Sequence, residues 1–116
     1  MSYLAVVSFD LSNATREDYV SAYEALVDLG LRGTLRSDKG AEVDLPTTTC
    51  AGEFTGPSSA AVRDSLKIRI DTAFTKLGLR GKTFVTVGGD WAWVQSGTPN
   101  SRSQPTPARP RSTNWR

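Results

Sequence analysis

The sequence of 116 residues contains no histidine and a single cysteine. Without histidine, the chain cannot form a Ser-His-Asp triad, a Cys-His pair or a histidine metal site. The lone Cys50 excludes a disulfide within the chain and a zinc site built from several thiolates. Any general base must therefore be a carboxylate, a lysine or a tyrosine.

Long apolar runs are also missing, and no segment approaches the length that crosses a membrane. The first ten residues lack the basic region and the cleavage site of a signal peptide, and their composition is typical of a strand. Sparse cysteine fits the reducing cytoplasm. We therefore expect a cytoplasmic protein that does not enter the membrane.

Charge is divided unevenly along the chain. Lys and Arg number 14 against 12 Asp and Glu, but residues 98–116 hold four arginines and no acid. The other residues therefore carry 14 − 4 = 10 bases and 12 acids. Proline and serine are also frequent in residues 98–116. We expect a folded domain over residues 1–97 and a disordered Arg/Pro/Ser-rich tail over 98–116.

Hydrophobic periodicity and turn residues divide the domain into two strand–helix–strand units. The pentapeptide Leu-Gly-Leu-Arg-Gly occurs at 29–33 and again at 77–81, where it closes each helix. The order βαββαβ predicts the α+β class and a ferredoxin-like sandwich, with one antiparallel sheet and both helices on one face. Strands are expected at 3–11, 31–36, 47–54 and 83–87, an edge or loop at 41–46, helices from Thr15 to Gly30 and from Ser58 or Ser59 to Gly78, and a candidate short fifth strand at 91–95.

One face of such a sheet carries no helix. Alternation along the first strand gives two sets of side chains, and both are apolar as far as Ser8. Further aromatic surface comes from Tyr3, Phe84, Trp91 and Trp93. An apolar sheet face predicts a homodimer through that face or through the fifth strand, with Trp91 and Trp93 at the interface. The alternative is that the fifth strand and the tail cover the face within one chain.

Three polar residues at strand ends are candidate catalytic groups. Asp10 closes the first strand, and Ser8 precedes it on the same face. Glu53 lies near the end of the third expected strand, so that an Asp10–Glu53 carboxylate pair is a further hypothesis. Carboxylate oxygens are ligands for Mg²⁺, and two Asp10 side chains of a dimer would share one ion. The alternative is that these acids are simply solvated.

Basic residues suggest contacts to a phosphate backbone. The candidates are Arg32 and Arg36 on the second strand and Arg63 and Lys67 on the second helix. The alternative for the helix residues is that their stems lie along the edges of the apolar stripe. The first 53 residues hold four bases and nine acids, a balance that disfavours general nucleic-acid binding.

The strand Ala5-Val-Val-Ser-Phe-Asp10, the helix after it, a turn-bearing second strand and Thr47-Thr-Thr together resemble the GhoS family. The resemblance covers roughly residues 3–87. That family consists of small ferredoxin-like antitoxins that act as endoribonucleases on toxin messenger RNA, and it is similar to VapD ribonucleases and CRISPR-adaptation endonucleases. The resemblance implies a homodimer in which the aspartate closing the first strand, here Asp10, binds metal or acts in catalysis.

Two functional hypotheses follow. The first is a cytoplasmic GhoS/VapD-like homodimeric endoribonuclease that uses Mg²⁺ at Asp10 and acts on RNA in a toxin–antitoxin or defence setting. The second is a non-catalytic dimeric interaction module, such as an antitoxin, an adaptor or an inhibitor. It would bind a protein partner through the sheet face and Trp91 and Trp93.

Overall fold

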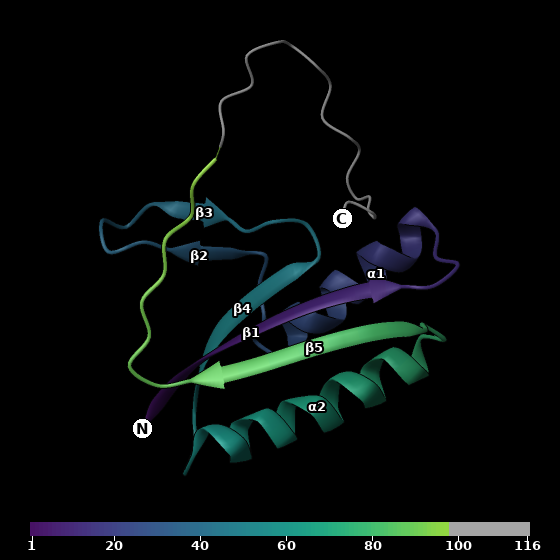
Figure 1. Cartoon of the computed structure of the whole chain (residues 1–116). Helices are drawn as coiled ribbons and strands as arrows, with labels where there is room; N and C mark the ends of the chain where they lie inside the picture. Colours follow the sequence, from purple (N-terminus) through teal and green to yellow (C-terminus); the bar gives the residue numbers. More distant parts are fainter. Residues whose placement is uncertain (98–116) are drawn as a thin grey trace.

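The computed structural model describes residues 1–97, and the tail expected over 98–116 lies outside them. The described chain has the α+β architecture that the sequence predicts, with two helices and an antiparallel sheet (Figure 1). In chain order its elements are β1 (Ser2–Leu11), α1 (Arg16–Asp28), β2 (Thr34–Arg36), β3 (Glu42–Asp44), β4 (Thr49–Thr55), α2 (Ser59–Lys76) and β5 (Gly81–Gly88).

The main sheet has three strands in the order β4-β1-β5, with β1 antiparallel to both neighbours. Strands β2 and β3 form a separate two-stranded sheet. The expected second strand is therefore divided. Arg32 makes an isolated bridge to Ala51 of β4, whereas residues 34–36 turn away to pair with β3. Residues 42–44, expected as part of an edge or loop, supply that partner strand.

Both helices begin at the residues that the sequence indicates. The Thr15 hydroxyl accepts a hydrogen bond from the backbone N–H of Asp18 at 3.1 Å, and the Asp18 carboxylate accepts one from the N–H of Thr15 at 3.0 Å. This reciprocal capping box satisfies two backbone donors at the start of α1. The Ser58 hydroxyl caps α2 through the N–H of Ala61 at 3.0 Å.

The repeated pentapeptide forms the same helix end twice. Gly30 and Gly78 both have positive φ, 93° and 72°, which glycine adopts without steric cost. In the first copy the N–H of Leu31 donates to the carbonyl of Leu26 at 2.8 Å. In the second the N–H of Leu79 donates to the carbonyl of Phe74 at 2.9 Å. The repeat thus marks two equivalent turns from helix to extended chain.

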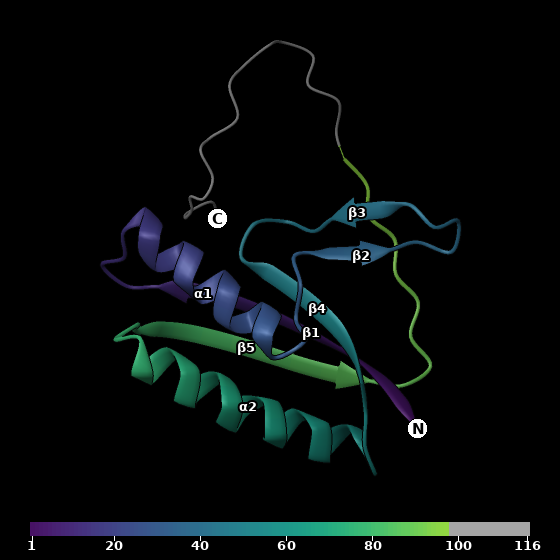
Figure 2. The ribbon, with the colours of Figure 1, turned by 180° about the vertical axis from the view of Figure 1, so that it is seen from behind.

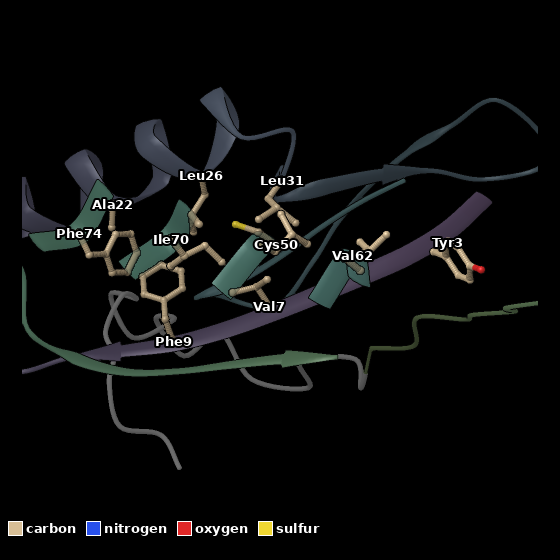
Figure 3. Close-up of a cluster of buried hydrophobic side chains, with 12 residues drawn as sticks. Tyr3, Val7, Phe9, Ala22, Leu26, Leu31, Cys50, Val62, Ile70 and Phe74 are labelled. Atoms are coloured by element: carbon tan, nitrogen blue, oxygen red, sulfur yellow. The ribbon is translucent and has the colours of Figure 1, made fainter. Parts of the chain in front are cut away.

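A single hydrophobic core lies between the sheet and the helices (Figure 3). Val7 and Phe9 of β1 pack there with Leu26 of α1 and Ile70 of α2. Helix α1 passes in front of β1 in Figure 2 and behind it in Figure 1. Tyr3, expected to add to the bare face, is also buried in this core, because odd-numbered residues of β1 face the helices.

The predicted fifth strand is wrong. Residues 91–97 adopt no strand, and Asp90, with φ of 51°, turns the chain away from β5. The segment runs beside the β2–β3 hairpin instead (Figure 1), where the Gln95 side-chain amide donates to the carbonyl of Asp44. Neither helix within residues 1–97 has both the length and the apolar character needed to cross a bilayer.

Candidate functional site on the open sheet face

The helices cover one face of the main sheet, and we call the opposite one the open face. Pairing register assigns its members, because residues directly opposite in an antiparallel pair point to the same side. The even-numbered residues of β1 lie along its centre, and Arg32 joins it through the bridge to Ala51. Its members are Leu4, Val6, Ser8 and Asp10 of β1, Thr49, Ala51 and Glu53 of β4, Lys82, Phe84 and Thr86 of β5, and Arg32.

Asp10 lies at the C-terminal end of β1 and is exposed. Its partner across the sheet is Lys82, so a carboxylate and an ammonium occupy neighbouring positions of the open face. Both border a hollow of about 440 Å³, which we call the Asp10 hollow. Its lining residues are Ser8, Phe9, Asp10, Thr48, Lys82, Thr83 and Phe84.

Ser8 and Phe84 form the next pair along the same two strands. The Ser8 side chain is half-buried, whereas Phe84 is 66 % exposed. The Asp10 hollow therefore combines a carboxylate, a cation, a hydroxyl and an exposed aromatic ring. These groups can coordinate a metal, contact a phosphate, form hydrogen bonds and stack on a planar ligand.

Thr48 borders the same hollow in a strained conformation. Its φ of 62° is rare for a β-branched residue and costs on the order of 1–3 kcal/mol. Two hydrogen bonds hold its backbone: the N–H donates to the Tyr23 hydroxyl at 2.7 Å, and the carbonyl accepts from the N–H of Phe9 at 3.1 Å. Residues held against backbone strain cluster at functional sites, so the strain at Thr48 favours a functional role for the Asp10 hollow.

Glu53 does not lie beside Asp10. It pairs with Leu4 at the other end of β1, because β4 runs antiparallel and its last residues meet the first residues of β1. The two positions are six residue steps apart along β1, which is about 20 Å. The predicted Asp10–Glu53 carboxylate pair is therefore wrong.

The structure does not bring the four predicted phosphate contacts together. Arg32 lies on the open face, whereas the Arg36 guanidinium donates to the carbonyl of Gly40 at 2.8 Å within the β2–β3 hairpin. Arg63 and Lys67 lie on α2 and pair with acids of the same helix. The distance from Arg63 Nη2 to Asp64 Oδ1 is 2.8 Å, and that from Lys67 Nζ to Asp71 Oδ2 is 2.7 Å. The Asp71 carboxylate also raises the pKa of Lys67 through that hydrogen bond.

Trp91 and Trp93 lie apart from the Asp10 hollow. They border a second hollow of about 480 Å³, between the segment after β5 and the β2–β3 hairpin. Both rings are half-buried, and their neighbours around this hollow include Lys39 and Val43. The two tryptophans therefore belong to the hairpin side of the molecule.

Metal binding within one copy of residues 1–97 lacks a complete ligand set. Nowhere in this range do three or more His, Cys, Asp or Glu residues gather closely enough to hold an ion. Asp10 is the acid of its hollow. Cys50 faces the core, and burial raises the pKa of its thiol to about 11. That thiol is protonated at neutral pH and is not a nucleophile there.

Phe9, Thr48, Lys82 and Thr83 line the Asp10 hollow but were not candidate site residues from the sequence, and Phe84 was expected only as part of the apolar sheet surface. Lys82 and Phe84 are visible as a basic and an aromatic residue, but their alignment with Asp10 and Ser8 depends on strand register. Comparison of the chain with models of known families and with curated protein sequences finds no match.

Proposed function

We propose that this chain is a GhoS/VapD-like endoribonuclease, active as a homodimer in the cytoplasm, in a toxin–antitoxin or defence setting. The single observation that carries the proposal is the Asp10 hollow. It joins an exposed carboxylate at the end of a central strand to Lys82 and Phe84, two groups suited to RNA. Arg32 bridges Ala51 on the side of β4 that faces away from β1. The segment with Arg32 thus extends the order β5-β1-β4 at the β4 edge, which supports a ferredoxin-like arrangement.

RNA cleavage at this site needs a charged group beside the scissile phosphate. Carboxylate oxygen is a ligand type that Mg²⁺ prefers, so Asp10 would hold the ion. A bound Mg²⁺ would stabilise charge on the phosphoryl oxygens and lower the pKa of a coordinated water. Since one copy offers a single carboxylate in the hollow, phosphate oxygens of the substrate and water would complete the coordination of the ion. Ser8 would donate a hydrogen bond to the substrate, and Lys82 and Arg32 would contact its phosphates.

The test is cleavage of a labelled single-stranded RNA by the purified full chain with Mg²⁺. We expect cleavage that EDTA abolishes, and a loss of about 100-fold or more in Asp10→Asn, because the amide keeps the shape but loses the charge that binds the ion. Glu24→Gln is the matched control, since Glu24 is an exposed acid on α1, away from the open face. Cleavage that survives in Asp10→Asn would remove Asp10 from the mechanism.

A second candidate is the non-catalytic dimeric interaction module. The observation that favours it is the incomplete ligand set around Asp10 within one copy of residues 1–97. In this case, the wild-type chain would not cleave RNA, and Trp91→Ala or Trp93→Ala would weaken binding to the protein partner. Light scattering that gives a monomer mass would contradict both candidates as stated, because each requires a dimer.

A further inference from the structure

Phe84 is a large aromatic residue that is 66 % exposed in the middle of a paired strand. A single exposed apolar residue is common on protein surfaces and alone indicates little. Phe84 differs from such isolated residues because polar and charged side chains surround it. It lies in a row on β5 between Lys82 and Thr86, opposite Ser8, and it borders the Asp10 hollow.

The geometry of a strand places these side chains in a defined series. Residues two apart on a strand project from the same face, about 6.6 Å from each other. On β5 the series is a cation, an aromatic ring and a hydroxyl. Pairing with β1 along the whole strand fixes the backbone under the ring, so little conformational freedom is lost when a planar group stacks on it.

We propose that Phe84 is a stacking platform for an unpaired RNA base, so that the substrate class of the Asp10 site is single-stranded RNA. This inference rests on the proposed function and specifies its substrate. A base inside a duplex has both faces covered, whereas an unpaired base can stack on an aromatic ring of a sheet. Lys82 contacts a backbone phosphate next to the stacked base.

The surroundings of Phe84 favour RNA over a second protein surface. The centres of protein–protein interfaces are depleted in charged residues. Phe84, by contrast, has Lys82 two residues away on its own strand and Asp10 opposite that lysine on β1. A dry apolar contact at Phe84 would have to bury or displace both charges, which is costly unless they are paired. A phosphate backbone complements the lysine and leaves the carboxylate free for a cation.

The experiment measures the affinity of the full chain for a fluorescent oligouridine of about 12 nucleotides, with EDTA present so that the RNA stays intact. The variants are Phe84→Ala, Phe84→Leu and Phe84→Trp. Ile68→Ala is the matched control, because Ile68 on α2 is 65 % exposed and lies outside the hollow. Thermal unfolding checks that each variant is folded, and light scattering reports its mass.

We expect Phe84→Ala and Phe84→Leu to bind about 5- to 100-fold more weakly, because both lose the aromatic face. Phe84→Trp and Ile68→Ala should bind like the wild type, and a duplex of the same length should bind at least about tenfold more weakly than the single strand. Equal affinity of Phe84→Leu and the wild type, or equal binding of the duplex, overturns the inference. A dimer that becomes a monomer in Phe84→Ala also overturns it, in favour of a protein contact.

Failure of this inference is separable from failure of the proposed function. RNA binding that depends on Phe84 without cleavage in Mg²⁺ would support the platform and contradict the endoribonuclease. Cleavage and RNA binding that are unchanged in Phe84→Ala would support the endoribonuclease and contradict the platform. A wild-type chain that binds no RNA would contradict both.

Discussion

The two faces of β1 differ in what they can contribute to the protein. Val7 and Phe9 face the helices and are buried in the core. Ser8, between them on the opposite face, is half-buried, and Asp10 is exposed. One strand therefore supplies the centre of the hydrophobic core and the centre of the candidate site. Substitutions on the covered face should therefore lower stability, whereas those on the open face should weaken RNA binding or cleavage.

The open face is itself divided along its length. Toward the start of β1 its apolar residues are buried, with Leu4 8 % and Ala51 2 % exposed, although Glu53 opposite Leu4 is exposed. Near the end of β1 it is accessible, with Asp10, Lys82 and Phe84 all exposed. The Asp10–Lys82 pair and the aromatic ring of Phe84 thus lie together at one end. A ligand of the open face is expected to bind there and to avoid the end occupied by Glu53.

The largest effect is expected for Phe9→Ala on the covered face. The Phe9 ring packs against three aromatic rings, with centroids 5.5 Å from Tyr23, 6.0 Å from Phe74 and 6.2 Å from Tyr19. Truncation should lower the free energy of unfolding by about 3–5 kcal/mol, since it removes these contacts and leaves a cavity. Urea denaturation measures the change.

Phe84→Ala is the matched control, because it removes the same side chain from the open face. Its free energy of unfolding should change by less than about 1 kcal/mol. Similar decreases in the free energy of unfolding of Phe9→Ala and Phe84→Ala would contradict the division of β1 and β5 into a stability face and a binding face.

A smaller effect on the covered face should appear as a dependence of stability on pH. Burial raises the pKa of the Cys50 thiol from 9.0 to about 11. Between these values the unfolded chain releases the proton while the folded chain retains it, so stability should fall as the pH rises. From pH 8.5 to 10.5 the loss due to Cys50 should be roughly 1–2 kcal/mol.

Cys50→Ala separates this loss from the titration of other groups. The variant should be less stable at pH 8.5, because a buried side chain is shortened, but its stability should fall less steeply up to pH 10.5. Denaturation curves at both pH values give the comparison. Parallel losses in the wild type and Cys50→Ala would show that the thiol does not titrate with folding.

Local sequence patterns were sufficient for much of the fold. Alternation separated Val7 and Phe9 from Ser8 and Asp10, because side chains on a strand alternate with a period of two. Thr15 with Asp18 predicted the start of α1, since the capping box is formed by residues three apart. The repeated pentapeptide predicted both helix ends for the same reason: each depends on contacts within a few residues.

Properties that depend on register were not predictable. The choice of partner for residues 34–36, the distance between Asp10 and Glu53, and the path of residues 91–97 all depend on how distant segments align. Alternation assigns a residue to a face but leaves its position along the neighbouring strand open. For that reason Ser8 and Asp10 were candidates from the sequence, whereas their partners Phe84 and Lys82 required the structure.

The smallest effect on stability is expected for Ser8→Ala on the open face. Its hydroxyl borders the Asp10 hollow, and Asp10 is two residues away, about 6.6 Å along the strand. Activation of a serine as a nucleophile needs a base within hydrogen-bond reach, and this spacing places the Asp10 carboxylate beyond that reach. Ser8 should therefore act on RNA through one hydrogen bond.

Accordingly, the free energy of unfolding of Ser8→Ala should change by less than about 0.5 kcal/mol. RNA affinity should fall about 2- to 10-fold, the value of one hydrogen bond. Cleavage should persist, in contrast to Asp10→Asn, because the carboxylate that holds the ion is intact. Denaturation, RNA titration and cleavage of the same preparation test the three statements. A loss of cleavage as large as that of Asp10→Asn, with RNA affinity retained, would instead assign Ser8 to the chemical step.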